Sequence, residues 1–286
     1  MLTQEELKEL RRLQVRLGKR VDALFSGDYR SAVRGRGMEF EEVRPYVPGD
    51  DIRYIDWNVT ARTSSPFIKV FREERQNTLL LAVDVSGSSR VGTGGRDGRT
   101  DRRLQQARIA GALAYAASAN RDRVGLVLFS DRVESFLPPR PVRSHAWAVI
   151  QALFSVDAQH RGTDLAAMFA HLSRVQRRRA TIVVMSDFLD DGPWAKALTT
   201  LSRRHEVHAV LVHDAFDAEV SGLGLVDVVD AETGETALVE GARWAEHSVA
   251  ARVEVVRRSG ARTVAIGTSD DPFIKLQNHF HHVRRR

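Results

Sequence analysis

The chain has 286 residues, of which 43% are apolar and 28% are charged, a balance typical of a globular protein in water. This length suffices for one large α/β domain, or for one such domain with a smaller added module. Because there is no Cys, disulfides and thiolate metal sites are excluded. No apolar run approaches the roughly 20 residues of a membrane-spanning helix, and the N-terminal stretch MLTQEELKEL lacks the apolar core of a signal peptide. We therefore expect a cytoplasmic protein that makes no membrane contact.

The net charge of +6 is modest for this length and comes largely from arginine clusters. These clusters are Arg102-Arg103, Arg177 to Arg179, Arg257-Arg258 and Arg284 to Arg286. Such clusters would permit binding to nucleic acid or to an acidic partner. They are far apart in the sequence and are not interleaved with aromatic residues, so a solvated surface is the favoured interpretation. Nucleic acid is therefore disfavoured as a partner.

Two regions precede the first strongly apolar strand. Residues 4–25 are expected to form an amphipathic helix, because apolar residues recur there at steps of three and four. The stretch 26–77 is rich in Gly and charge and has no clear apolar period, so loops and a small sheet are expected, with a strand at 67–71. We assign residues 1–77 to an N-terminal helix-plus-loop/β module and residues 78–286 to the main domain.

From residue 78 onward, apolar runs alternate with helix-like stretches. Strands are predicted at 79–84, 123–130, 180–186, 206–213 and 261–267. Helices are predicted at about 101–119, 144–155, 164–178, 191–204, 242–259 and 270–283. This alternation predicts an α/β fold with a doubly wound, mainly parallel sheet. Residues 131–137 are expected to pair back on the preceding strand, and residues 224–240 to form an inserted hairpin around a Glu-Thr-Gly-Glu turn.

Oxygen-bearing side chains follow the first buried strand directly. That strand ends at Asp84, and Ser86 and Ser88 follow at alternate positions. Ligands of an open parallel sheet bind beyond the carboxyl ends of its strands, which makes Thr163 and Asp187, also at the ends of loops or strands, candidates for the same place. Compact oxygen donors suit a hard cation such as Mg²⁺. Neutral hydroxyls would leave the metal electron-poor, so a carboxylate from another protein could complete its coordination.

Each part of this pattern also has a purely structural interpretation. An Asp at a strand end followed by Ser is often only a turn or a helix cap. Thr163, taken alone, is more often a helix cap than a ligand. The occurrence of all the parts in this order, on these predicted elements, favours the metal site.

The stretch DVSGS at 84–88, with the later Thr and Asp, resembles the metal-ion-dependent adhesion site (MIDAS) of von Willebrand factor type A domains. Those domains have a doubly wound, mostly parallel sheet, and the resemblance covers about residues 78–270. It implies a divalent cation, Mg²⁺ or another such as Mn²⁺ or Ca²⁺. The ligands that it implies are Asp84, Ser86 and Ser88 from the first loop, Thr163 from the second and Asp187 from the third.

A second motif lies upstream, at residues 35–62, where acids alternate with arginines and aromatic residues are interspersed. One interpretation is structural: ion pairs and a turn fix this module onto the main domain. The other is a partner-docking surface, because aromatic residues and Arg are enriched in such surfaces. The residues predicted for this surface are Arg44, Tyr46, Asp50, Asp51, Arg53, Asp56, Trp57 and Arg62.

The same block resembles the signature of the DUF58 family of bacterial proteins, close to G-x-G-x-E-F-x-x-x-R-x-Y-x-x-G-D-D-x-R-x-I-D-W with a T-A-R ending. Proteins of that family combine the signature with a von Willebrand type A-like domain and are commonly encoded beside MoxR-type AAA+ ATPases. The resemblance implies a chaperone-like, cytoplasmic adaptor that works with such an ATPase in maturation or assembly of client proteins. Several relatives carry membrane helices near the N-terminus; this sequence shows none, so membrane attachment is not implied.

The favoured function is thus a non-enzymatic, metal-dependent protein-binding adaptor, with a carboxylate of the client protein at the metal. The first alternative is a metal-assisted, phosphatase-like hydrolase, because a strand-end Asp beside Mg²⁺ also occurs in aspartyl-phosphate enzymes. Such enzymes normally carry a second Asp two residues on, where this chain has Ser86. The second alternative is a nucleic-acid-binding protein that uses the arginine clusters.

Overall fold

The computed structural model describes residues 38–63, 65–73, 77–90, 101–141, 143–156, 158–214, 217, 224–241 and 248–283. The helix predicted at 4–25 lies outside the described residues, as do the first residues of the helix predicted at 242–259.

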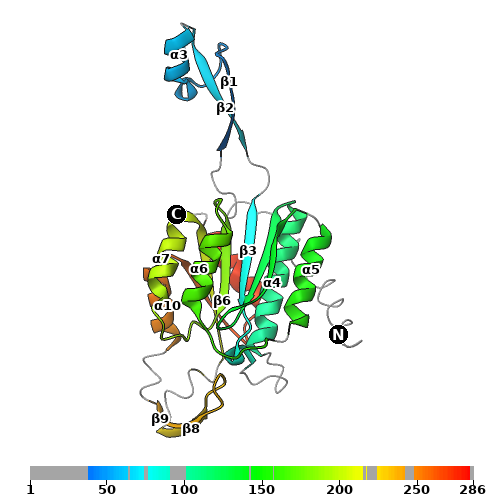
Figure 1. The fold of residues 1–286 in the computed structure, drawn as a ribbon, viewed down its shortest axis with the longest axis vertical. Helices are drawn as coiled ribbons and strands as arrows, with labels where there is room; N and C mark the ends of the chain where they lie inside the picture. The colour runs from blue at the N-terminus through cyan, green and yellow to red at the C-terminus, as the bar shows by residue number, and fades with distance from the viewer. Residues whose placement is uncertain are drawn as a thin grey trace.

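The main domain is built on a six-stranded sheet with the strand order β10-β7-β6-β3-β4-β5 (Figure 1). Its strands are β3 (Thr78–Asp84), β4 (Arg123–Phe129), β5 (Val133–Arg140), β6 (Thr181–Ser186), β7 (Glu206–His213) and β10 (Arg262–Gly267). All neighbouring pairs are parallel except β4 and β5, which are antiparallel at one edge. The predicted mainly parallel sheet is therefore confirmed, and so is the segment expected to pair back on β4.

The central strand β3 pairs with β4 on one side and β6 on the other. Residues 79–84 are all buried, as expected for a strand covered on both faces. The chain leaves β3 toward β4 and leaves β6 in the opposite direction, toward β7. The carboxyl ends of β3 and β6 thus flank the point where the winding reverses, which is where open α/β sheets bind ligands.

Helices cover both faces of the sheet (Figure 1). One face carries α4 (Arg102–Ala119), α5 (Arg143–Ser155) and α11 (Pro272–Val283), and the other carries α6 (Leu165–Val175), α7 (Trp194–Arg204) and α10 (Val249–Arg258). The helices α4, α5, α6, α7 and α11 lie within about three residues of their predicted ranges, whereas α10 begins at Val249, after its cap at Ser248, and not at the predicted residue 242. The doubly wound arrangement inferred from the alternation of strands and helices is confirmed.

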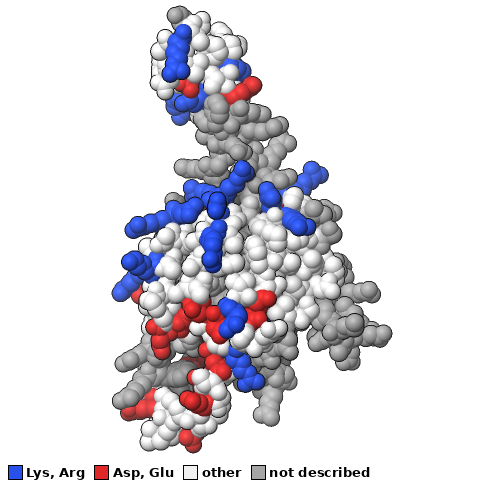
Figure 2. Space-filling model, viewed as in Figure 1, with Lys and Arg blue, Asp and Glu red and all other residues white. Residues whose placement is uncertain are grey.

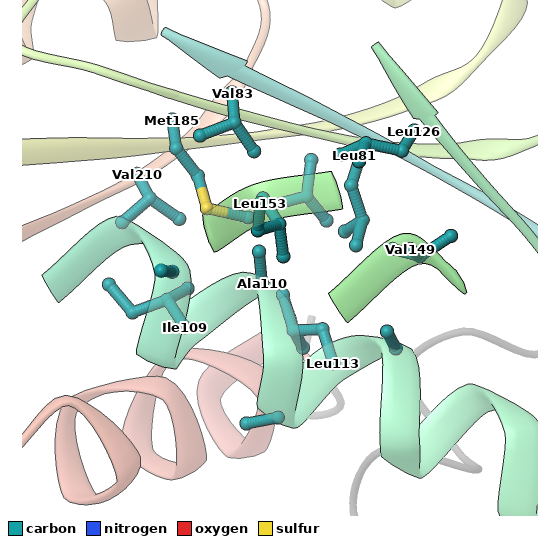
Figure 3. Packing of buried hydrophobic residues seen from close by; sticks show 14 of the residues in the cluster. Leu81, Val83, Ile109, Ala110, Leu113, Leu126, Val149, Leu153, Met185 and Val210 are labelled. Carbon is teal, nitrogen blue, oxygen red and sulfur yellow. The ribbon is translucent and has the colours of Figure 1, made fainter. Parts of the chain in front are cut away.

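The sheet has an apolar core on each face, and one of these cores lies between β3, β4 and the helices α4 and α5. Figure 3 shows Leu81 of β3 and Leu126 of β4 pointing toward Leu113 of α4 and Leu153 of α5. All of these side chains are almost completely excluded from water. Burial of each contributes about 1.5–3 kcal/mol relative to its exposure, so this packing fixes the frame from which the loops beyond the strands extend.

A small module precedes the main domain. Its strands β1 (Met38–Pro45) and β2 (Phe67–Glu73) form a separate antiparallel sheet, which confirms the small sheet expected here. Between them lie the 3-10 helix η1 (Ile52–Tyr54) and the helix α3 (Trp57–Thr63), which was not predicted. α3 begins where it does because Oδ1 of Asp56 accepts the N–H groups of Asn58 and Val59, as a helix cap does. The proposed division of the chain at residue 77 stays a prediction.

The strands β8 (Leu225–Val229) and β9 (Thr236–Glu240) form another antiparallel pair, the hairpin expected within 224–240. In Figure 1 this hairpin lies at one end of the molecule, beyond the carboxyl ends of the parallel strands. The β1–β2 module lies at the other end, beyond their amino ends. The two hairpins therefore project from opposite edges of the sheet.

Charge is divided between the same two edges. Figure 2 shows Asp and Glu gathered next to the β8–β9 hairpin, with Lys and Arg prominent toward the β1–β2 module. The basic residues there include exposed arginines at or just beyond the carboxyl ends of α6, α7 and α10: Arg177, Arg178, Arg179, Arg203, Arg204, Arg257 and Arg258. Cations at helix carboxyl ends are favoured by the helix dipole, which gives these arginines a structural role.

Candidate metal centre

Asp84 is the last residue of β3 and is only 1% exposed. Its Oδ1 accepts the backbone N–H of Ser86 at 2.9 Å, and its Oδ2 accepts the hydroxyl of Ser186 at 2.7 Å. Burial raises the pKa of Asp84 to about 7, with the negative charge of Asp187 as the second cause. A carboxyl group desolvated beside another acid would be stabilised in its ionised form by a bound cation.

The hydroxyls of Ser86 and Ser88 lie side by side, with 3.1 Å between their Oγ atoms. Ser89 holds the turn that follows β3, because its Oγ donates to the carbonyl oxygen of Ser86 at 2.7 Å. Neighbouring ligands of an octahedral cation with bonds of about 2.1 Å are themselves about 3 Å apart. The separation of the two hydroxyls fits this geometry.

Asp187 follows β6, across the point where the winding reverses. Its Oδ1 accepts the N–H of Leu189 at 3.1 Å, and its Oδ2 accepts Nη1 of Arg102 at 2.9 Å. The same nitrogen of Arg102 lies 3.3 Å from the carbonyl oxygen of Ser88, which it also donates to. Arg102 therefore bridges the first and third loops of the candidate site.

The guanidinium of Arg102 belongs to a buried network that the sequence analysis missed. Its Nη2 pairs with Asp217, and Arg252 of α10 donates to the carbonyl oxygen of Asp187 at 2.6 Å and to Asp217 at 3.2 Å. The interpretation of Arg102 as part of a solvated surface cluster is wrong, because it is 3% exposed. Since 85 residues separate Arg102 from Asp187, no local pattern could have identified the pair.

Thr163 lies two residues before the start of α6. The cap of this helix is Asp164, whose side chain accepts the N–H of Ala167 at 2.7 Å, so the interpretation of Thr163 as the cap is wrong. The Thr163 hydroxyl instead donates to Oε1 of Glu232, at 2.6 Å. Glu232 stands in the turn of the β8–β9 hairpin and was not a candidate in the sequence analysis. Burial raises the pKa of Glu232, and the charge of Asp187 contributes to the same shift.

The first and second loops are joined by the backbone, because the N–H of Gly87 donates to the carbonyl oxygen of Arg161 at 2.8 Å. The predicted ligands Asp84, Ser86, Ser88, Thr163 and Asp187 therefore come from loops at the same edge of the sheet. Their role in binding a metal stays a prediction.

The donor set can be compared with what a cation requires. Within the described part of the chain, no group of three or more His, Cys, Asp and Glu side chains is arranged to hold a metal. A cation here would depend on hydroxyl oxygens, with Asp84 and Asp187 as the acids and Arg102 offsetting part of the charge of Asp187. Each carboxylate oxygen has a second lone pair beyond its hydrogen bond. These donors fit a hard, weakly held divalent cation that lacks one anionic ligand.

The ion pairs of the upstream block are local. Arg44 makes two bonds to Asp50, at 2.8 and 2.7 Å, and Arg53 makes bonds of 2.6 to 3.1 Å to Asp51. Each pair joins residues of the same module, so the interpretation that such pairs fix the module onto the main domain is wrong for these residues. They stabilise the turn between β1 and α3.

The remaining residues predicted for the docking surface differ in exposure. Asp56 is buried and caps α3, and Tyr46 is half-buried, with its N–H donating to the carbonyl oxygen of Pro66 at 2.9 Å. Trp57 is 70% exposed and Arg62, in the last turn of α3, is exposed as well. The acids thus organise the module, whereas Trp57 and Arg62 face solvent.

The family model described as "Protein of unknown function DUF58" matches residues 42–259. The chain belongs to the DUF58 family. The DUF58 chain is 33% identical over 227 residues to the uncharacterized protein Rv1480 of Mycobacterium tuberculosis, which covers 79% of this chain and 70% of that protein. It is 44% identical over 73 residues to the uncharacterized protein MAV169 of Mycobacterium avium, covering 26% of this chain and 43% of that protein. The resemblance seen at residues 35–62 is confirmed at the level of the family.

The fold of this DUF58 protein is similar to that of solved structures. BatB from Bacteroides thetaiotaomicron aligns with a TM-score of 0.50 at 13% identity, over 73% of this chain and 100% of that chain. The VWA domain of SpRpn10 aligns over 71% of this chain and 94% of that chain, at 13% identity and a TM-score of 0.37. An alignment with this score carries no argument about the fold. At such identities the likeness concerns the fold alone. Among the described residues, no helix is both long and apolar enough to cross a membrane.

Proposed function

We propose that this DUF58 protein is a non-enzymatic adaptor that binds another protein through a divalent cation, with Mg²⁺ as the favoured ion. The observation that carries the proposal is the pair of Ser86 and Ser88 hydroxyls, 3.1 Å apart, beside the buried carboxyl group of Asp84. A cation bound there by few charged ligands would attract one more anion, and a protein carboxylate is the simplest source. Such binding needs no bond to be made or broken.

The partner that we propose is a MoxR-type AAA+ ATPase, with the client protein contributing the carboxylate. Support for a second contact surface comes from the β1–β2 module. Val47, Ile52 and Trp57 are 55%, 66% and 70% exposed there, in or next to a turn held by internal ion pairs. Exposed apolar residues on a rigid support are typical of a docking surface, and a Trp is a frequent hot spot. We propose that the ATPase binds this module and that the client binds the metal centre.

The contacts of Ser86 support a binding role over hydrolysis. Its Oγ lies beside Ser88 Oγ, another hydroxyl, and it stands where aspartyl-phosphate enzymes carry a second carboxylate. The positive charge next to Asp187 is the guanidinium of Arg102, which is already paired with two acids. These contacts favour a site that holds ligands in place.

The proposal is tested by co-purification of the full chain with a MoxR-type ATPase and with a candidate client protein, in Mg²⁺ and in EDTA. Asp84→Ala is compared with Asp191→Ala, which removes an exposed acid near the same edge. We expect the client to be lost in EDTA and with Asp84→Ala, and to be retained with Asp191→Ala, while the ATPase is retained throughout. Circular dichroism verifies that both variants fold. Equal client capture under all conditions would overturn the metal bridge.

A further inference from the structure

We propose that Glu232 is an intrinsic carboxylate ligand of the candidate metal centre. The β8–β9 turn places it where the carboxylate of a client would otherwise bind, so the protein competes with its own client. This inference rests on the proposed function for the identity of the ligand that Glu232 replaces. The position of Glu232 itself rests on contacts that are independent of any cation.

The first of these contacts is the bond from Thr163 Oγ1 to Glu232 Oε1, at 2.6 Å. A hydroxyl and a carboxylate at this distance form a charge-assisted hydrogen bond, one of the stronger kinds in proteins. The two residues are 69 positions apart, so the bond joins the hairpin to the second loop of the centre. Thr163 is also one of the five predicted ligands. The carboxylate of Glu232 therefore contacts one of the five predicted ligands directly.

Gly87 makes room for the turn, whereas a side chain at Gly162 would make only ordinary contacts. A Cβ at Gly87 would clash with the carbonyl oxygen of Ala231 and lie 3.0 Å from its carbonyl carbon. A Cβ at Gly162 would lie 3.8 Å from Oε2 of Glu232. Gly87 belongs to the first loop and Gly162 to the second. The backbone of the turn thus packs against the first loop, and the Glu232 carboxylate lies next to the second loop.

The turn is organised to present Glu232 in one orientation. Oδ1 of Asp230 accepts the N–H groups of Glu232 and Thr233, at 2.7 and 3.1 Å. The backbone N–H of Asp230 donates to the carbonyl oxygen of Glu235 at 2.8 Å, and Gly234 adopts a φ of +76°, which glycine tolerates at little cost. Because these bonds are internal to the turn, they persist whether or not the turn lies on the centre.

Among the described residues, no apolar side chain of the hairpin is fully buried, and Val226, Val228 and Val239 are half-buried. The large side chains Leu225, Val229 and Leu238 are 70%, 67% and 62% exposed. The bond from Thr163 to Glu232 is therefore one of the contacts that keep the turn in place. A client must displace Glu232. The apparent affinity for the client is therefore the intrinsic affinity multiplied by the fraction of molecules in which the hairpin is lifted.

The experiment uses the full chain as wild type, as Glu232→Ala and as Glu235→Ala, a matched change in the same turn at an exposed residue. Hydrogen exchange of peptides covering residues 225–240 is measured in EDTA and in Mn²⁺, and Mn²⁺ affinity is measured by titration calorimetry. In EDTA we expect exchange to be roughly tenfold faster in Glu232→Ala than in wild type, because one hydrogen bond to a charged group is lost. We expect Mn²⁺ to bind roughly tenfold more weakly to Glu232→Ala. Glu235→Ala should behave as wild type in both.

The outcomes separate this inference from the proposed function. If wild type binds Mn²⁺ and Glu232→Ala matches it in affinity and exchange, the intrinsic ligand is overturned while the metal centre stands. If wild type does not bind Mn²⁺, the metal-dependent function and the role of Glu232 as a metal ligand are both refuted. Faster exchange of Glu232→Ala in EDTA would then support only the contact of Glu232 with the loops. Slower exchange of wild type in Mn²⁺, absent from Glu232→Ala, supports both.

Discussion

The guanidinium of Arg102 lies 2.9 Å from the carboxylate of Asp187, so a fixed positive charge stands beside one of the two acids predicted to hold a cation. Both side chains are almost fully buried. The charge of Arg102 offsets that of Asp187 and leaves Asp84 as the acid with the greater need of a counter-ion. A bound cation and Arg102 would share Asp187, which predicts modest metal affinity.

Removal of Arg102 tests the buried network. Arg102→Ala would leave Asp187 and part of Asp217 without their partner, so we expect a loss of about 3–5 kcal/mol in the free energy of unfolding. Urea unfolding measures it. Arg258→Ala is the control, because Arg258 is 78% exposed in an ion pair with Glu254 and should contribute at most about 1 kcal/mol. Equal losses in the two variants would contradict the prediction.

Removal of the metal should be visible in stability. If Mg²⁺ or Mn²⁺ binds the folded chain alone, wild type gains about 2.7 kcal/mol at a concentration of one hundred times Kd. Thermal unfolding in metal and in EDTA measures this gain. Asp84→Ala should show none, whereas Asp191→Ala, at an exposed acid, should respond as wild type does. A wild-type Tm that is the same in metal and in EDTA would refute a specific site.

The pH dependence of stability is predicted at Asp122, away from the candidate centre. Asp122 is buried, its Oδ1 accepts the N–H of Asn77 at 3.0 Å, and burial raises its pKa to about 6. The folded pKa exceeds the ordinary value of 3.8, so the folded state favours the protonated acid. The resulting stability is present below about pH 4 and is lost as the pH rises through about 6.

Asp122→Asn keeps an acceptor for Asn77 and removes the buried charge. We expect it to be more stable than wild type by on the order of 1–3 kcal/mol at pH 7.5, with the difference vanishing near pH 4. Urea unfolding of both proteins at the two pH values measures the difference. An Asn variant less stable than wild type at pH 7.5 would mean that the carboxylate itself is needed.

The docking surface on the β1–β2 module is tested at Trp57. Because Trp57 is 70% exposed, Trp57→Ala should change the free energy of unfolding by no more than about 0.5 kcal/mol. We expect ATPase binding to weaken by at least about 2 kcal/mol, the range of an interface hot spot. Ile274→Ala, on α11 at a side chain that is 53% exposed, is the control for loss of a surface apolar group. Unchanged binding by the Trp57 variant would place the ATPase elsewhere.

The parts of the fold that could be predicted from the sequence are those whose pattern lies within a few neighbouring residues. The strands β3 and β6 contain the apolar runs LLLAV and IVVM, and Asp84 and Asp187, which come shortly after these runs, mark the carboxyl edge of the sheet. The helix α3 was missed because it spans only Trp57–Thr63 and buries no residue, so it has no apolar stripe. Its signal was the cap at Asp56, which is visible in sequence only as one acid among several.

The parts that could not be predicted depend on contacts between distant residues. The partners in the pairs Arg102–Asp187 and Thr163–Glu232 are 85 and 69 positions apart in the sequence. Each partner, considered alone, is an ordinary charged or polar residue. An arginine next to a helix start and a glutamate in a hairpin turn are both expected at a surface. Only the packing of α4 and the return of the hairpin over the loops bring them to the candidate centre.

Strand β3 connects the β1–β2 module to the candidate metal centre through the middle of the sheet. It starts a few residues after β2 and ends at Asp84, and it is hydrogen-bonded along both sides. Seven residues at about 3.3 Å each form a stiff rod of roughly 23 Å between the two ends. Two macromolecules bound at these ends would be held on opposite sides of the sheet, and each would raise the local concentration of the other. Such a rod suits a bivalent tether that assembles a ternary complex.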